Sequence, residues 1–131
     1  MKYIFETEVR GYELDSYGHM NNAVYINYTE QARWKILHDA GLLESLRDKN
    51  LLLVVTETSI RYMRELKLFD KVSVETSVCY KAPYLIFYHD ILNKTGSQKS
   101  AKAEIKTLLI DKNRIPQDLP KELLELTKQD C

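Results

Sequence analysis

YELDSYGHMNNAVYINYTEQAR, residues 12–33, joins a polar loop to the most strongly helical part of the chain. An aspartate, a glycine, a histidine and two asparagines stand between positions 15 and 22. An asparagine at 21 or 22 suits a helix N-cap, and Gly41 suits a left-handed stop. Between them, apolar residues recur at spacings of one, three and four, namely Val24, Tyr25, Tyr28, Ala32, Ile36 and Ala40. This stripe predicts a helix from about residue 22 to residue 40.

Alternating apolar and polar residues predict five strands around this helix. They lie at 3–9, 52–62, 72–80, 84–92 and 99–110. Short connections such as KLFD (67–70) and NKTG (93–96) favour antiparallel neighbours. The expected class is α+β, with a five-stranded antiparallel sheet covered by one long central helix. KELLELTKQD (121–130) adds a short C-terminal helix, and we expect a single domain over 1–131.

One helix on one sheet makes a thin core, and the opposite sheet face needs either a partner or a polar coat. We therefore expect a homodimer or homotetramer in which helices or sheet edges meet.

Charge argues against two classes of partner. The 19 basic and 19 acidic residues cancel and are scattered over the 131 positions, so we expect no nucleic-acid partner. Glu6 and Glu8 interrupt the N-terminal apolar stretch, and no apolar run approaches the roughly 20 residues of a membrane span. We expect a cytoplasmic protein without membrane insertion.

Metal-binding spacing is absent from the sequence. Cys79 and Cys131 form no CxxC pair, and we interpret both as free thiols. His19, His38 and His89 have no H-x3-H or H-E-x-x-H spacing. We expect no metal site.

Asp15 lies on the loop beside the expected helix start. The first turn of a helix leaves backbone N–H groups unpaired, and its dipole adds positive charge that favours an oxyanion or a polarised carbonyl. Gly18 permits a sharp turn and close approach of a ligand. A carboxylate there can activate water or attack an acyl carbon. Alternatively, Asp15 only closes an Asx-turn or supplements the cap.

DSYGHMNNAVYINYTEQAR, residues 15–33, resembles the signature D-x-x-G-H-[VM]-N-N-x-x-Y-x-x-x-x-E-x-A-R of hotdog-fold acyl-CoA thioesterases of the 4-hydroxybenzoyl-CoA thioesterase type. IRYMRELKLFD (60–70) resembles that family's I-x-Y-x-R-P-x-x-x-G-D strand and turn, and SAKAEIKTLLID fits its last strand. The resemblance covers nearly the whole chain. It implies a hotdog fold, with the sheet wrapped around the central helix.

The resemblance also implies a mechanism. The residue aligned with Asp15 acts as general base or nucleophile on the thioester carbonyl, and the backbone N–H aligned with Asn22 polarises the carbonyl oxygen. The implied reaction releases a carboxylic acid and free coenzyme A. It needs no metal and no cofactor, because coenzyme A is part of the substrate.

Other residues receive less specific roles. His19 joins the candidate catalytic set, although fixing the loop is the favoured role for it. Gly18 is a candidate for substrate contact. Tyr25 belongs to the apolar stripe but is also a candidate substrate contact, and Tyr62 is a candidate for lining an acyl tunnel. Coenzyme A phosphates require cations, for which Arg64 and Lys81 are candidates.

Glu30 and Arg33 stand three apart on the helix, where a surface ion pair is the default interpretation. The chain departs from the family pattern in three places. It reads Tyr12-Glu13-Leu14 where an acidic-small pair is usual before the aspartate, and it has Glu65 in place of proline and Phe69 in place of glycine.

Three alternatives to an acyl-CoA hydrolase stay open. The first is a non-catalytic acyl-CoA-binding or sensor protein that keeps the pocket. The second is a thioesterase acting on acyl carrier protein. The third is a dehydratase of the same fold, which relies on a differently placed histidine for which His38 and His89 offer no motif.

Overall fold

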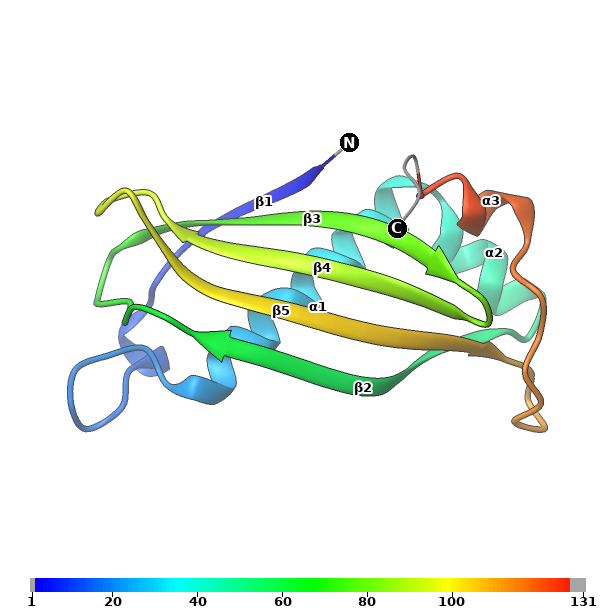
Figure 1. Ribbon diagram of the computed structural model, residues 1–131, viewed down its shortest axis with the longest axis horizontal. Helices are drawn as coiled ribbons and strands as arrows, with labels where there is room; N and C mark the ends of the chain where they lie inside the picture. The colour runs from blue at the N-terminus through cyan, green and yellow to red at the C-terminus, as the bar shows by residue number, and fades with distance from the viewer. Residues whose placement is uncertain (1, 128–131) are drawn as a thin grey trace.

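The computed structural model describes residues 2–127. These residues form five strands, three α-helices and one short 3-10 helix. Figure 1 shows their arrangement. In chain order they are β1 (Tyr3–Glu8), η1 (Gly11–Glu13), α1 (Asn22–Asp39), α2 (Leu42–Asp48), β2 (Leu52–Tyr62), β3 (Lys71–Lys81), β4 (Tyr84–Asn93), β5 (Gln98–Ile110) and α3 (Lys121–Leu124).

The strands form one antiparallel sheet in the order β1-β3-β4-β5-β2. The five predicted strands are confirmed, but the inference drawn from KLFD is wrong. β2 pairs with β5 at one edge, through contacts such as Tyr62 with Ala101, and the two strands β5 and β4 separate β2 from β3. The segment between β2 and β3 therefore crosses the end of the sheet, and a short connection was no guide to adjacency.

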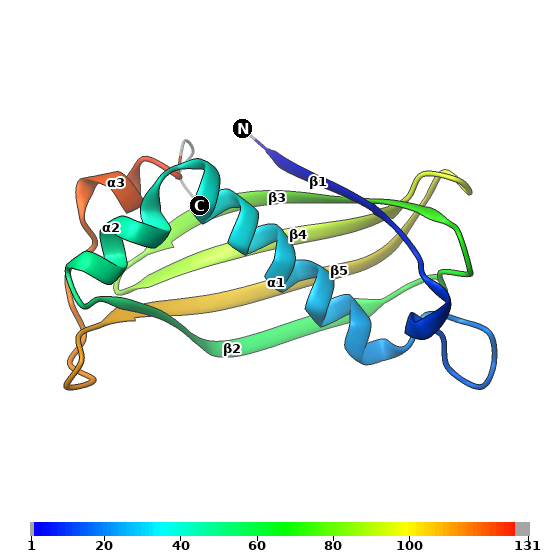
Figure 2. The ribbon, with the colours of Figure 1, turned by 180° about the vertical axis from the view of Figure 1, so that it is seen from behind.

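Helix α1 lies diagonally across one face of the sheet (Figure 2). Alternation in β5 explains why this face is apolar: Ala101, Ala103 and Ile105 are buried, whereas Lys102 and Glu104 are exposed. The predicted helix 22–40 is confirmed, and its stripe supplies buried side chains, namely Tyr25, Tyr28, Ala32 and Ile36. Apolar burial between this stripe and the sheet holds the two layers together.

A second helix, α2, was not predicted. Gly41 adopts φ +71° and ends α1 as expected, but the chain enters another helix at once. Leu42 and Leu46, one turn apart, are buried in the core beside Ile36. The prediction of one central helix and one short C-terminal helix therefore missed α2.

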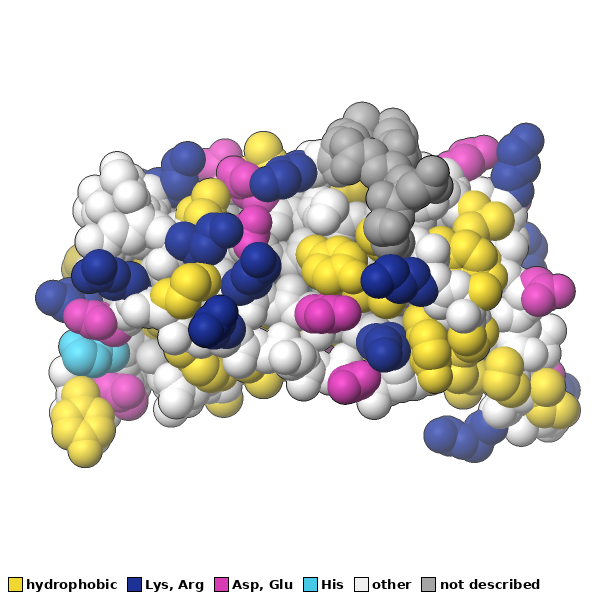
Figure 3. Space-filling view, viewed as in Figure 1, with side chains coloured by type: hydrophobic (Ala, Val, Ile, Leu, Met, Phe, Trp, Pro, Cys, Tyr) yellow, Lys and Arg dark blue, Asp and Glu magenta, His cyan; other side chains and the backbone are white. Residues whose placement is uncertain are grey.

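The opposite face of the sheet carries Lys and Arg interspersed among Asp and Glu, with hydrophobic patches between them (Figure 3). Lys2 lies 3.5 Å from Glu75, and Lys106 lies 3.2 Å from Glu57. This face is therefore charged in part and apolar in part, and both possibilities, a partner and a polar coat, stay predictions.

The C-terminal helix is shorter than predicted, since α3 covers Lys121–Leu124 and residues 128–130 of the predicted segment lie outside the described residues. Cys79 is not a free thiol, so that expectation is wrong, and Cys131 lies outside the described part of the chain. Within residues 2–127, no helix has the length and apolar character needed to cross a membrane.

Candidate active site

Residues 14–20 form a small paired loop between η1 and α1. Leu14 and Met20 form an antiparallel bridge, and the Asp15 N–H donates to the His19 carbonyl across 2.8 Å. The chain reverses at Gly18, whose φ of +79° strains any other residue. A Cβ there would meet nothing within 4 Å, so the turn, not crowding, requires glycine.

The Asp15 carboxylate divides its oxygens between two roles. Oδ1 accepts hydrogen bonds from the backbone N–H of Tyr17 at 2.9 Å and of His19 at 3.2 Å. The Asx-turn considered as an alternative is therefore present. Oδ2 accepts no hydrogen bond from residues 2–127, and the side chain is only half-buried. One oxygen holds the loop, and the other is free for chemistry.

The helix start leaves one amide unpaired. Asn21 is the N-cap: its Oδ1 accepts from Ala23 N–H at 2.9 Å, and its carbonyl accepts from Val24 N–H at 2.9 Å. Within the described chain, the Asn22 N–H has no acceptor. The exposed amide predicted to polarise a carbonyl is thus an available donor at the positive end of an 18-residue helix.

Tyr62 fixes the Asn22 peptide from the other side. Its hydroxyl donates to the Asn22 carbonyl across 2.9 Å, which ties the end of β2 to the first residue of α1. Its ring meets the Tyr25 ring edge-on, with centroids 5.1 Å apart. Tyr25 is only 3% exposed and belongs to the core, whereas Tyr62 is 43% exposed. Of the two tyrosines, Tyr62 is the one whose ring is open to a ligand.

Glu13 anchors the loop to the helix, a role that the sequence did not indicate. Its side chain accepts hydrogen bonds from Tyr28 Oη at 2.7 Å and from the Arg10 backbone at 2.9 Å and side chain at 3.1 Å. Its carbonyl accepts from Asn21 N–H at 2.8 Å. Burial acts to raise the pKa of Glu13, but the hydrogen bonds from Arg10 and Tyr28 outweigh it and leave the pKa below its ordinary value.

His19 contributes through its backbone. Its N–H and carbonyl both bond Asp15, and it forms a bridge with Lys67. Its ring makes no hydrogen bond to residues 2–127. The observed contacts are those of the loop-fixing role.

The two candidate cations lie at opposite ends of the sheet. Arg64 follows β2 at the end near the loop, where its N–H donates to Ser100 O at 3.1 Å. Lys81 ends β3, ten residue steps or about 33 Å from Lys71, which pairs with Glu8 just before the loop. Within one chain, Lys81 and Asp15 are not brought together.

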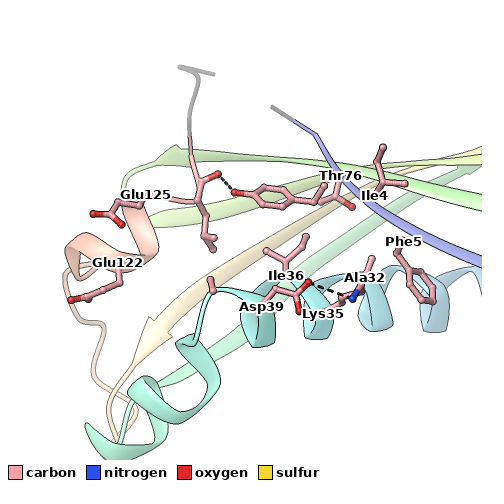
Figure 4. A pocket seen from close by; sticks show the side chains of 12 residues that line it. Ile4, Phe5, Ala32, Lys35, Ile36, Asp39, Thr76, Glu122 and Glu125 are labelled. Carbon is pink, nitrogen blue, oxygen red and sulfur yellow. Dashed lines mark hydrogen bonds and ion pairs between the residues drawn. The ribbon is translucent and has the colours of Figure 1, made fainter.

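Two sizeable cavities flank α1, and residues 13–22 line neither. The β1-side cavity, about 480 Å3, lies between β1, α1 and α3 (Figure 4). There Lys35 pairs with Asp39 at 3.4 Å, and Tyr3 Oη donates to Leu126 O at 3.1 Å. The β2-side cavity, about 680 Å3, lies between α1, α2 and β2. Neither of these two cavities reaches the Asp15 loop.

Arg33 was expected in a surface pair with Glu30, and this is wrong. Its side chain is 9% exposed, and Nη1 lies 3.2 Å from Nε2 of the fully buried His89. The other ring nitrogen of His89 lies 2.7 Å from Thr76 Oγ1. Burial, followed by the nearby Arg33 charge, lowers the pKa of His89 to about 3, so its ring is neutral at pH 7. This line of hydrogen bonds passes under α1 from one cavity to the other.

The described residues offer no cluster of three or more His, Cys, Asp or Glu side chains suited to a metal ion. The absence of a metal requirement stays a prediction.

The sequence profile of the Thioesterase-like superfamily matches residues 9–126, and the chain belongs to this family. Among curated relatives, the long-chain acyl-CoA thioesterase FadM of Escherichia coli is 34% identical over 73 residues, which cover 56% of this chain. The matched part spans 55% of the length of FadM. The chloroplastic acyl-acyl carrier protein thioesterase ATL3 of Arabidopsis thaliana is 27% identical, with 95% of this chain and 69% of ATL3 covered.

Solved structures agree on the hotdog fold. The probable thioesterase YbaW of Escherichia coli superposes with a TM-score of 0.85 at 30% identity, covering 95% of both chains. The Staphylococcus aureus protein SAV2348, solved in complex with CoA, gives a TM-score of 0.88 at 17% identity, covering 96% of this chain and 81% of that one. At this identity the second likeness concerns the fold alone.

Proposed function

We propose that this protein hydrolyses acyl-CoA thioesters at the Asp15 loop. One observation carries the proposal: among residues 2–127, neither Asp15 Oδ2 nor the Asn22 N–H has a hydrogen-bond partner, and the two groups lie at the two ends of a loop closed by the Glu13–Asn21 hydrogen bond. A carboxylate and an amide donor are the two groups that attack on a thioester carbonyl requires. Membership of the Thioesterase-like superfamily supports the reaction class.

In the proposed reaction, the Asn22 N–H binds the thioester carbonyl oxygen and stabilises the charge that develops there. Asp15 acts through Oδ2 in one of two ways. As general base it takes a proton from water while the water oxygen bonds the acyl carbon, and the proton then passes to the departing thiolate. As nucleophile it bonds the acyl carbon while the C–S bond breaks, which gives an anhydride and a free thiolate. Water then hydrolyses the anhydride, which restores Asp15, and the proton that the water releases passes to the thiolate. Both routes release a carboxylic acid and free coenzyme A.

The other candidate residues receive supporting roles from their positions relative to the Asp15 loop. Gly18 and His19 shape the loop, Tyr62 orients the Asn22 peptide and borders the acyl group, and Arg64 binds phosphate at the same end of the sheet. Lys81 can serve that loop only from a second copy of the chain, given its place in β3. We retain it as a candidate on that condition.

We propose a homodimer or homotetramer. Strand β2, 11 residues long, ends the sheet: β5 pairs with one side of it, and no strand of residues 2–127 pairs with the other. Leu52 and Val55 on this strand are 55% and 48% exposed. Exposed apolar edges of this length associate readily.

The curated relatives differ in the carrier of the acyl group, which is coenzyme A in one and acyl carrier protein in the other. The similarity to FadM favours a long-chain acyl-CoA, and the similarity to ATL3 favours a second candidate, an acyl carrier protein thioester. The finer resemblance to the 4-hydroxybenzoyl-CoA thioesterase type and a cytoplasmic location stay predictions. Hydrolysis rates on matched dodecanoyl-CoA and dodecanoyl-acyl carrier protein decide between the carriers.

The rival of another class is a sensor that binds acyl-CoA without cleaving it. Incubation of the purified chain with dodecanoyl-CoA and a thiol reagent separates the two. Thiol release at a rate proportional to protein supports hydrolysis, whereas a stable complex without thiol release contradicts it.

A further inference from the structure

The outer face of the sheet, opposite α1, carries a cluster of cations at the end nearest the Asp15 loop. Arg61 lies directly opposite Lys102 where β2 pairs with β5. Residues that are opposite one another in this way share one face of a sheet. Lys102 is exposed, whereas its neighbours Ala101 and Ala103 are buried on the α1 face. Both cations therefore lie on the outer face.

The charges of this cluster are only partly neutralised. Like charges directly opposite one another destabilise a sheet, and neither Arg61 nor Lys102 forms an ion pair with a carboxylate of residues 2–127. Lys99 lies 3.5 Å from Asp90, but Lys2 also lies 3.9 Å from that carboxylate. We call Arg61, Lys99 and Lys102 the outer basic patch. It combines a cost in pairing with an excess of positive charge.

The outer basic patch lies on an open face and not in a hollow. Neither of the two cavities that flank α1 includes a residue of the patch. Figure 3 views this face directly and shows Lys and Arg side chains gathered in its left half around small hydrophobic patches. Met63, directly after β2, is 42% exposed. Small-molecule sites are concave, so cations spread over a sheet face suit the surface of a macromolecule better.

The patch lies back to back with the proposed active site. Tyr62 follows Arg61, and because side chains alternate along a strand, the two point to opposite faces. On the α1 face, Tyr62 Oη donates to the Asn22 carbonyl at 2.9 Å. β2 ends at Tyr62, and it is the edge strand of the sheet. A flexible arm from the patch to the Asn22 N–H therefore passes only around the end of this edge strand.

Association through the β2 edge leaves the patch open. Leu52 and Val55, the exposed apolar residues of that edge, lie at least six residues or about 20 Å along β2 from Arg61. An edge-to-edge contact uses the backbone groups in the plane of the sheet. The side chains of the outer face stay exposed in such a dimer.

We propose that the outer basic patch docks an acidic acyl carrier protein, whose acyl group then reaches the Asp15 loop around the end of β2. The proposal rests on the proposed function and decides between its two carriers. A phosphate on Arg64 is common to both, because coenzyme A and the arm of a carrier protein each contain one. The patch is a further set of cations, and it matches an acidic protein surface. Complementary charge of this kind speeds association and orients the partner.

The double variant Arg61→Gln, Lys102→Gln is assayed on the full chain with dodecanoyl-acyl carrier protein and dodecanoyl-CoA. We expect kcat/KM for the carrier protein substrate to fall about tenfold at low salt, through KM, and kcat/KM for the CoA substrate to change by less than about twofold. The loss shrinks as salt is raised, because exposed charges are screened. An unchanged rate on the carrier protein, or an equal loss on both substrates, would overturn the proposal.

A matched control removes two exposed cations beyond the C-terminal end of β5. Lys112→Gln, Lys121→Gln changes the net charge by the same amount, and we expect wild-type kcat/KM on both substrates. An equal loss in this control would assign the effect to net charge and overturn the patch. Arg61→Gln, Lys102→Gln is expected to fold, since it removes two like charges that face each other.

A binding experiment separates this proposal from the proposed function. Calorimetric titration of the full chain with acyl carrier protein that has its arm but no acyl group requires no hydrolysis. Affinity that falls about tenfold in Arg61→Gln, Lys102→Gln supports the patch even if no thioester is cleaved, an outcome that contradicts the hydrolase function alone. Absence of binding would overturn the proposal. Co-sedimentation with phosphatidylglycerol vesicles would then assign the patch to an anionic membrane surface.

Discussion

Asp15 and Asp111 each close a five-residue loop of the same kind, but of these two aspartates only Asp111 has partners within residues 2–127 for both carboxylate oxygens. In each loop Oδ1 accepts the N–H groups two and four residues on, which for Asp111 are those of Asn113 at 2.8 Å and Ile115 at 3.0 Å. The second oxygen of Asp111 accepts from Gln117 Nε2 at 3.2 Å. The second oxygen of Asp15 has no partner among residues 2–127. The chain therefore contains an internal comparison between a purely structural loop and the proposed catalytic one.

Tyr62→Phe removes the hydroxyl that fixes the Asn22 carbonyl and keeps the ring that meets Tyr25. Loss of one such hydrogen bond costs about 1 kcal/mol. We expect about a tenfold fall in kcat with little change in KM, because the hydroxyl orients the donor and does not bind the acyl chain. Steady-state kinetics on dodecanoyl-CoA measure this. Tyr12→Phe, at a position 82% exposed, is the control, and equal effects in both variants would refute the positioning role.

Glu13→Gln tests the anchor of the loop. The folded pKa of Glu13 lies below its unfolded value, so the carboxylate stabilises the fold above the unfolded pKa, and this contribution is lost as pH falls through the folded pKa. We expect the variant to lose about 1–3 kcal/mol of unfolding free energy at pH 7. Urea titrations at several pH values should show the difference from wild type shrinking below pH 4.5, the ordinary value. A difference that does not change with pH would rule out the charge as its cause.

His89 makes the fold sensitive to acid. Its folded pKa is lowered to about 3 from 6.5, so the unfolded chain binds more protons between these values and stability falls as pH drops from 6.5 toward 3. We expect His89→Gln to show a shallower loss of unfolding free energy between pH 6.5 and 4.5. His38→Gln, at an exposed position, serves as the control. Parallel pH profiles for wild type and His89→Gln would exclude His89 as the sensitive group.

Association through β2 is tested by Val55→Lys, which places a charge on the exposed edge. We expect a shift toward monomer in sedimentation velocity, together with lower hydrolysis if a second chain completes the site. Ile4→Lys changes an exposed apolar residue on β1, at the other edge, and should leave the assembly intact. Dissociation by the β1 variant alone would move the interface to that edge.

The parts that local pattern determines could be predicted. Residues 22–40 show a helical stripe between an asparagine cap and Gly41, and the observed α1 ends within one residue of that range. Each strand alternates with a period of two, so the number of strands was also predictable. The order was not, because the pairing of β2 with β5 depends on how apolar faces close over α1.

Tertiary contacts account for what was missed. Glu13 becomes important through Tyr28, 15 residues away, and Arg33 through His89, 56 residues away. No spacing rule connects such pairs. The loop at Asp111 was equally hidden, since Arg114 adopts φ +65° where the first loop has glycine. For α2, a signal did exist in the one-turn spacing of Leu42 and Leu46.

The most direct measurement is the rate of dodecanoyl-CoA hydrolysis by Asp15→Asn beside Asp111→Asn. An asparagine oxygen still accepts the two loop amides, so both variants are expected to fold and to keep their assembly. The account predicts a loss of about a hundredfold or more in kcat for Asp15→Asn and a rate close to wild type for Asp111→Asn. Undiminished hydrolysis by folded Asp15→Asn would contradict it.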